Sequence, residues 1–254
     1  MRIQPLQNNI YTPNFGKISR AVYQTNKTGS AKRILHRNDS SFFRDDFFWV
    51  RLTNILGEKY KNSNKVNVIE YACSNGSETY SFILLMLSSL GERAKKFFPV
   101  IAIDFDEYVI NIAKSGLIEI TTDEIMTIEH LAKCSVGDFF DLTKTPEKKV
   151  YATPKPILKE NAIFEKADVV TEMYNLPKSE DTVLLARNFW PFLKMEDARN
   201  LVKVICERLD KNSTLVLGRL DENYFCSYKG VSLSAIFQQE GFKSVDNSGL
   251  ILVR

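Results

Sequence analysis

The chain lacks the residues that usually reveal a metal site or a disulfide framework. Its 254 residues include only two histidines and four cysteines, and no two cysteines form a C-x-x-C pair. We therefore expect reduced thiols and no metal site. The net charge of +3 is too small to indicate a nucleic-acid partner.

Long apolar runs are absent as well. The N-terminus is polar and has no apolar core like that of a signal peptide, and the longest apolar run, Phe82 to Leu87, is far too short to cross a bilayer. These absences predict a cytoplasmic protein with no membrane insertion.

Glycine is scarce where nucleotide phosphates are usually bound. Val66 to Tyr71 form a short apolar run, and the turn of small residues after it holds one glycine, Gly76. A helical pattern then runs from Ser77 to Leu90. This strand–turn–helix unit lacks the G-x-G-x-x-G spacing with which a backbone cradles a pyrophosphate. The missing glycines disfavour a nicotinamide-dependent dehydrogenase.

A second expected strand, residues 98–103, leads into Asp104. A carboxylate at this point of a nucleotide-binding fold usually accepts hydrogen bonds from the two hydroxyls of a ribose. A ribose acceptor without a phosphate loop predicts an adenosine cofactor that has no phosphates. S-adenosylmethionine is the commonest such cofactor, and S-adenosylhomocysteine is its demethylated product.

The alternation of strands and helices predicts an α/β fold with a mostly parallel sheet, helices on both faces and an antiparallel hairpin at one edge. This is the class I methyltransferase, Rossmann-like arrangement. We expect a tail over residues 1–30, which includes a short helix over 17–26, and one domain over residues 31–254. The remaining expected elements are a loop over 27–41, helices over 42–56, 106–115, 122–132, 195–209 and 231–240, strands over 162–170, 182–186, 213–218, 242–245 and 249–253, and a hairpin near 143–160.

Ligands of such sheets lie outside the carboxyl ends of the strands. The polar residues just after each expected strand are therefore candidate cofactor contacts: Gly76, Glu78, Asp104, Asp168 and Asn188, with the flanking residues Cys73, Phe105 and Val169. Asp168 could accept from an adenine amino group. The aromatic residues after Asn188 are suited to contact a sulfonium as they contact any cation.

Five motifs occur in an order that resembles the CheR-type protein-glutamate methyltransferases. Asn38 to Arg44 resembles the family's N-x-T-x-F-F-R, and Ala72 to Ser81 resembles its G-C-S-T-G-E-E-P-Y-S. Asp104-Phe105-Asp106 with the later Ala-Lys-Ser-Gly is similar to D-I-D…A-R-x-G. Arg187-Asn188 and Leu217-Gly218 are similar to parts of C-R-N-V-x-I-Y-F and L-G-H-S-E.

This resemblance implies a methyl transfer from S-adenosylmethionine to a protein carboxylate. It implies that Asn38, Ser40 and Arg44 fold over the cofactor, and that Arg44 lies near the substrate carboxylate. Arg44 and Asn188 are then the catalytic candidates. A carboxylate is ionised at neutral pH and needs no general base, and an arginine can pair with it through two hydrogen bonds.

The chain departs from the family pattern at several positions. Ser77 and Thr79 stand where the family has Glu and Pro, Phe192 stands where it has Tyr, and Arg219-Leu220-Asp221 replaces H-S-E. These departures keep a second hypothesis open, a degenerate module that binds the cofactor for regulation. A third is a methyltransferase for RNA or a small molecule, which the basic stretch from Lys17 to Arg51 favours weakly. We expect a monomer whose partner is an acceptor protein or a small carboxylate.

Overall fold

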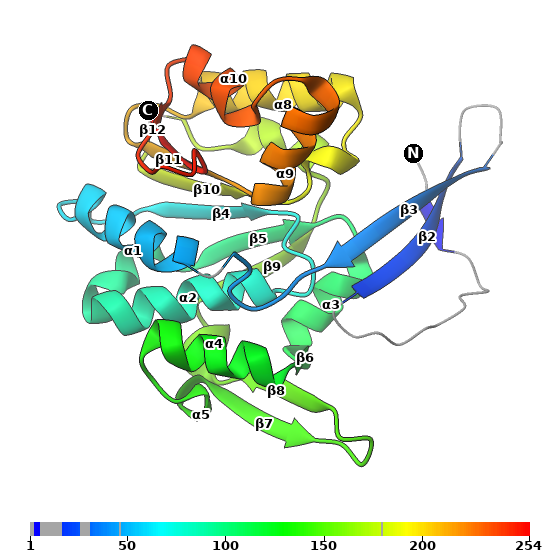
Figure 1. Cartoon of the computed structure of the whole chain (residues 1–254), viewed down its shortest axis with the longest axis vertical. Coiled ribbons are helices and arrows are strands. Elements are labelled where there is room, and N and C mark those ends of the chain that lie inside the picture. The colour runs from blue at the N-terminus through cyan, green and yellow to red at the C-terminus, as the bar shows by residue number, and fades with distance from the viewer. Residues whose placement is uncertain (1–2, 6–16, 26–30, 46, 179) are drawn as a thin grey trace.

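The computed structural model of the chain describes residues 3–5, 17–25, 31–45, 47–178 and 180–254. Within these residues, the largest sheet has seven strands in the order β12-β13-β11-β10-β4-β5-β9. The strands from β11 to β9 run parallel, and β13 pairs antiparallel with both β11 and β12 (Figure 1). This confirms the predicted class I methyltransferase fold and its C-terminal hairpin.

The strands of this sheet are β4 (Asn67–Tyr71), β5 (Val100–Asp104), β9 (Ala162–Lys166), β10 (Thr182–Ala186), β11 (Ser213–Leu217), β12 (Lys243–Ser244) and β13 (Ile251–Val253). Every residue of β10 and β11 is buried, as expected for parallel strands that are covered on both faces. Their apolar runs are therefore fixed in the centre of the sheet. Both strands end at the same edge, where polar residues follow.

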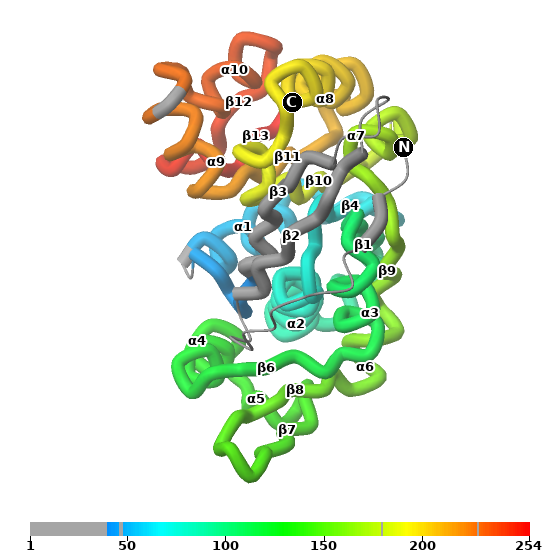
Figure 2. The backbone as a smooth tube through the Cα atoms, turned by 90° about the vertical axis from the view of Figure 1, so that its right-hand side faces the viewer, coloured from blue at the N-terminus to red at the C-terminus, as the bar shows by residue number. Residues whose placement is uncertain are grey.

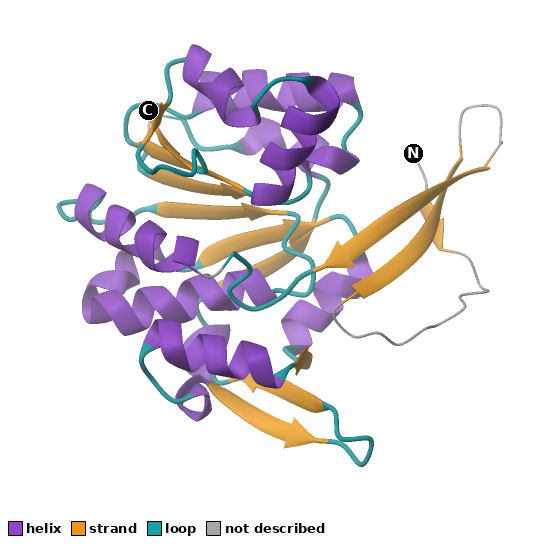
Figure 3. Ribbon diagram, viewed as in Figure 1, coloured by secondary structure: helices purple, strands orange, loops and turns teal. Residues whose placement is uncertain are grey.

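Helices surround the sheet (Figure 3). They are α1 (Phe47–Lys59), α2 (Ser77–Leu90), α3 (Glu107–Ser115), α4 (Thr122–Ala132), α5 (Val136–Phe139), α6 (Pro156–Lys159), α7 (Val169–Glu172), α8 (Met195–Arg208), α9 (Arg219–Tyr224) and α10 (Leu233–Gln239). Short 3-10 or π segments are η1 (Gly91–Phe97), η2 (Met173–Asn175), η3 (Trp190–Phe192) and η4 (Phe225–Lys229). Figure 1 shows α8, α9 and α10 grouped on the side of β10, and α1, α2 and α3 on the side of β4 and β5.

The predicted hairpin near residues 143–160 is part of a small second sheet. Strands β7 (Phe140–Lys144) and β8 (Val150–Pro154) pair antiparallel, and β6 (Ile118–Ile120) pairs with β8. The turned view in Figure 2 places this sheet at the opposite end of the molecule from α8 and α10. Among the residues that the structure describes, no helix is long and apolar enough to span a membrane.

The prediction for the N-terminal segment was wrong. Residues 17–26 were expected to be a helix and 27–41 a loop, but Lys17–Thr25 is strand β2 and Ala31–Asp39 is strand β3. They pair antiparallel, and β2 also pairs with β1 (Ile3–Pro5). A helix of nine residues is marginal on its own, whereas pairing over nine positions satisfies the backbone groups of both segments.

Several boundaries also differ from the prediction, and three of these differences have a clear physical context. Helix α1 begins at Phe47 instead of residue 42. It also continues past Gly57, because the missing side chain of Gly57 leaves room for Leu90. A Cβ on Gly57 would lie 2.9 Å from Leu90 Cδ2. The expected strand over 162–170 ends at Lys166, because Asp168 caps the short helix α7 and so ends the extended backbone.

Candidate functional site

The turn between β4 and α2 is built around left-handed backbone. Gly76 has a φ of 82°, and a Cβ there would lie 3.0 Å from Phe164 and 3.1 Å from Ala113. Glycine is therefore required by the backbone conformation and by close packing against protein, not only by an approaching ligand. Cys73 is buried beneath the turn, and burial raises the pKa of its thiol.

Asp104 ends β5 and faces this turn. Its Oδ2 accepts a hydrogen bond from Ser74 N at 3.0 Å, and its Oδ1 accepts one from Asp106 N at 2.9 Å. Burial raises the pKa of the Asp104 carboxyl to about 6, although the two backbone N–H groups oppose the shift. Each carboxylate oxygen keeps a further lone pair, so the group can still accept from ribose hydroxyls.

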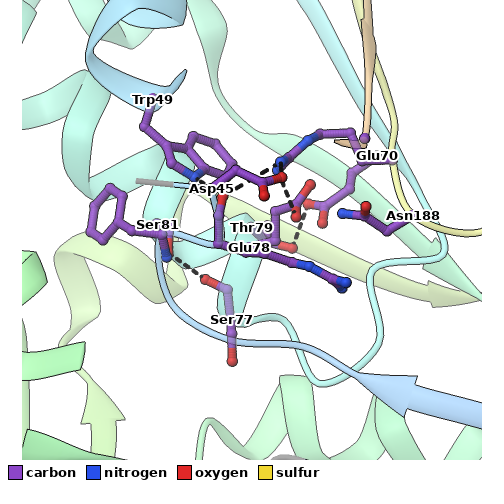
Figure 4. Close-up of polar contacts among 12 residues, drawn as sticks. Asp45, Trp49, Glu70, Ser77, Glu78, Thr79, Ser81 and Asn188 are labelled. Atoms are coloured by element: carbon purple, nitrogen blue, oxygen red, sulfur yellow. Dashed lines mark hydrogen bonds and ion pairs between the residues drawn. The ribbon is translucent and has the colours of Figure 1, made fainter. Parts of the chain in front are cut away.

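A buried arginine lies behind the start of α2. Arg187 Nη1 is 2.7 Å from Glu78 Oε2, and its Nη2 is 2.9 Å from Asp45 Oδ2. The guanidinium carbon lies 4.7 Å from the centre of the Phe48 ring and 4.9 Å from that of Trp49. The close-up in Figure 4 shows Asp45, Glu78 and Trp49 close to one another in this part of the site.

Glu70 is a second acid in this cluster. It lies on β4, is 2% exposed, and its Oε2 accepts a hydrogen bond from Thr79 Oγ1 at 2.6 Å. Burial, and then the neighbouring Glu78 carboxylate, raise the pKa of Glu70 well above its usual value. Thr79, which departs from the family's proline, thus supplies a partner for a buried carboxyl (Figure 4).

Asn188 follows β10 and has a φ of 61°. Its backbone N–H donates to Asp221 Oδ2 at 2.5 Å, and Gly218 N donates to the same oxygen at 3.0 Å. Trp190 N donates to Asp221 Oδ1 at 3.1 Å. Burial raises the pKa of Asp221 to about 7, while these N–H groups oppose the shift. One carboxyl group therefore ties together the loops that follow β10 and β11.

The residues 40–45, here called the roof segment, are held against α2 and α4. Phe43 N donates to Ser81 Oγ at 2.9 Å, and Phe42 N donates to Glu124 Oε1 at 3.0 Å. The side chains of Phe42 and Phe43 are buried. Trp49 Nε1 donates to the Arg44 carbonyl at 2.7 Å. The roof segment is thus anchored through the backbone groups of Phe42, Phe43 and Arg44.

Backbone strain concentrates around this site. Among the described residues, seven non-glycine positions have a positive φ, and five of them lie in the roof segment, the β4–α2 turn or the loop after β10. These five are Phe43, Asp45, Ala72, Ser74 and Asn188. Such conformations cost free energy and cluster at active sites and ligand clamps. Their grouping marks this edge of the sheet as the candidate functional site.

The predicted site residues are distributed unevenly over this region. Gly76, Glu78, Asp104 and Asn188 lie at the carboxyl ends of β4, β5 and β10. Phe105 follows Asp104 and is half-buried. Asp168 is exposed, and its Oδ1 accepts from Val170 N at 2.9 Å at the start of α7, beside Val169. Their contacts with a cofactor stay predictions.

The structure describes to different extents the three residues that were predicted to fold over the cofactor. Ser40 and Arg44 are half-buried, and Arg44 has interaction partners within the protein. The side chain of Asn38 lies outside the described residues, although its backbone belongs to β3. A contact of any of these three with the cofactor stays a prediction.

Sequence reasoning missed Asp45, Glu70 and Asp221 as site residues, and it named Arg187 only as part of a motif, without a role. Glu70 and Arg187 carried the only usable signal, because an ionisable residue inside or next to a buried apolar run needs a partner. The partner of Arg187 is 142 residues away at Asp45, so the sequence pattern could not identify it.

The residues present fit an adenosine cofactor without phosphates. Ser74 Oγ and Asn188 Oδ1 are buried and have no hydrogen-bond partner in the described part of the chain. Both lie at strand ends where a ligand of this fold binds, and buried polar atoms are seldom left unpaired. Several carboxyl groups stand nearby, which suits a cofactor with an ammonium and a sulfonium.

The titration of Asp104 gives a test of this geometry. Its folded pKa of about 6 lies above its ordinary value of 3.8, so the folded state holds the proton more tightly. The stabilisation is complete below pH 3.8 and is lost as the pH rises through about 6. In urea unfolding at a series of pH values, Asp104→Asn should show a flatter dependence over this range. Equal slopes for the two proteins would contradict the assignment.

Comparison with known proteins agrees with the site. Residues 38–225 match the family described as CheR methyltransferase, SAM binding domain. The chemotaxis protein methyltransferase of Listeria monocytogenes serovar 1/2a is 25% identical over 185 residues, which are 71% of this chain and 64% of the relative. The chain thus spans slightly less than two thirds of that relative.

Solved structures resemble the chain more distantly. A TehB-like SAM-dependent methyltransferase from Corynebacterium glutamicum is 13% identical with a TM-score of 0.40, over 85% of this chain and 86% of that one. CalS10, an amino pentose methyltransferase from Micromonospora echinaspora, is 13% identical with a TM-score of 0.36, over 68% and 49%. At these TM-scores neither likeness bears on function. The family match, however, covers well over half of the chain, so the chain belongs to the CheR methyltransferase SAM-binding domain family, and its cofactor is S-adenosylmethionine.

Proposed function

We propose that the protein is a methyltransferase that uses S-adenosylmethionine to methylate a carboxylate, in the manner of protein-glutamate methyltransferases. The observation that carries the proposal is the pairing of Asp104 with the β4–α2 turn at a strained sheet edge. The turn offers no phosphate loop, and Asp104 keeps lone pairs for ribose hydroxyls. The family match supports the same reading.

The cofactor supplies a methyl group on a sulfonium that is already activated, so the chain has to align the acceptor. In this proposal Asp104 accepts from the ribose, and Asp168, with Phe105 and Val169, lies at the adenine. Glu78 and Asn188 face the methionine end. The buried Glu78 carboxylate adds negative charge there, which favours the sulfonium and the ammonium electrostatically.

Arg44 is the residue that we assign to the acceptor. It sits in the roof segment beside Asp45, and a guanidinium can hold a carboxylate through two hydrogen bonds. The acceptor carboxylate is ionised at neutral pH, so no general base is needed. His130 is exposed on α4 and takes no part in this scheme. The four cysteines are free thiols, which favours action in the reducing cytoplasm.

Calorimetric titration with S-adenosylhomocysteine tests the cofactor half of the proposal. Wild-type protein should bind it, and Asp104→Ala should bind about a hundredfold more weakly, because two hydrogen bonds to a charged group contribute about 3 kcal/mol. If neither S-adenosylmethionine nor its product binds the wild type, the methyltransferase proposal fails.

A labelled-methyl assay on cell lysate tests the acceptor half. A carboxyl methyl ester is lost in mild alkali, whereas methyl groups on RNA bases or amines survive it. Arg44→Ala should keep cofactor binding and lose transfer. Binding of the cofactor without transfer to any acceptor would favour the regulatory module, and an alkali-stable product would favour an RNA or small-molecule substrate.

A further inference from the structure

Arg187 connects three parts of the site that are far apart in the sequence. The residue itself belongs to the loop after β10, Asp45 belongs to the roof segment, and Glu78 belongs to the first turn of α2. The arginine side chain is 1% exposed, and those of Asp45 and Glu78 are 15% and 12% exposed. The two ion pairs are therefore poorly screened by solvent.

The geometry requires an arginine rather than any cation. Two nitrogens of one planar group reach two carboxylates on different segments, at 2.7 and 2.9 Å. The same plane lies against the rings of Phe48 and Trp49 on α1. A lysine ammonium is a point charge, which reproduces neither the fork nor the contact with two rings. The stacking also fixes the orientation of the guanidinium.

The charges around the Arg187 guanidinium indicate what its removal would do to the site. The single positive charge of Arg187 balances the charge of one of its two carboxylate partners. A third acid, Glu70, has a raised pKa and is therefore protonated more readily. Without the arginine, Asp45 and Glu78 would face each other as like charges in a poorly solvated site. Since α2 is fixed by its buried face, the roof segment is the part that would move away.

We propose that Arg187 is a positioning residue that locks the roof segment onto α2 and holds Glu78 in place for the cofactor. The inference rests on the proposed function, because it assigns Glu78 to the methionine end of the cofactor. The roof segment then forms a fixed wall of a site that is assembled before the cofactor binds. Arg187 acts through Glu78 and Asp45, and its guanidinium does not itself take part in methyl transfer.

The test combines binding with local exchange. Affinity for S-adenosylhomocysteine is measured by calorimetry, and amide hydrogen exchange is followed at Phe43, whose N–H donates to Ser81 Oγ. Arg187→Lys should weaken binding at least tenfold and speed exchange at Phe43 at least tenfold. Arg199→Lys, on the exposed face of α8, is the matched control and should change neither quantity.

Asp45→Asn breaks only the partly exposed arm of the lock, so it keeps the test valid if Arg187→Lys does not fold. It should reduce affinity and speed exchange to a smaller extent, and it should add no further loss to Arg187→Lys. A lower melting temperature with unchanged affinity in Arg187→Lys, or no change at all in Asp45→Asn, would overturn the inference. If the wild type binds no S-adenosylhomocysteine, the proposed function fails, while exchange at Phe43 still decides whether the lock exists.

Discussion

Replacing Asp221 with alanine is expected to lower the free energy of unfolding by about 3 kcal/mol or more. The buried carboxylate accepts the N–H groups of Asn188, Trp190 and Gly218. Each buried donor that loses its acceptor costs about 1–3 kcal/mol. Because these donors lie in the loops after β10 and β11, the loss should loosen both loops at once.

Urea unfolding followed by circular dichroism measures this effect. Asp221→Asn keeps an amide oxygen that can accept some of these hydrogen bonds. Its free energy of unfolding should therefore fall by less, about 1–2 kcal/mol. Glu196→Ala, an exposed acid in the first turn of α8, is the control and should stay within about 0.5 kcal/mol of wild type. A loss in Asp221→Ala no larger than that of the control would show that water replaces the carboxylate without cost.

The parts of the fold that the sequence predicted well are those specified locally. Helix α4 was predicted with the correct ends, and in the structure Thr121 and Glu124 form a capping box that marks its start. Strand β10 was also predicted with the correct ends, since a buried parallel strand is a continuous apolar run. Helix α2 likewise begins at Ser77, directly after the left-handed Gly76.

The errors arose where structure depends on distant partners. Strand β2 gains its structure from pairing with β3, and nothing within residues 17–25 specifies that partner. The same limit applies to the site. The strand ends indicated Glu78 and Asn188, but the groups that hold them, Arg187 and Asp221, are fixed by contacts between segments far apart in the sequence.

The departures from the family pattern are accommodated by local partners. Thr79 donates to the buried Glu70, and Ser77 Oγ donates to Asn75 Oδ1 at 2.8 Å. Asp221, where the family has Glu, accepts three backbone N–H groups. These three substituted residues are therefore part of the hydrogen-bond network of the site.

Substituting Gly218 by alanine is expected to abolish the alignment on which methyl transfer depends. The backbone at Gly218 is extended, so alanine meets no conformational penalty there. The obstacle is space: the added Cβ would lie 2.6 Å from Asn188 Cγ and 2.7 Å from Asn188 N. Because Asn188 is held by Asp221, it cannot retreat without breaking that hydrogen bond.

We expect Gly218→Ala to cost about 1–3 kcal/mol in stability, as overpacking usually does, and to reduce methyl transfer far more than that loss explains. Alignment within the site is sensitive to displacements of about 1 Å, which can cost on the order of a hundredfold in rate. Gly137→Ala is the matched control, because its Cβ would meet only Ser135 Oγ at 3.5 Å. Transfer is measured with labelled cofactor at a temperature where both variants are folded. Wild-type transfer by Gly218→Ala would show that Asn188 has freedom to move, and would remove it from the catalytic assignment.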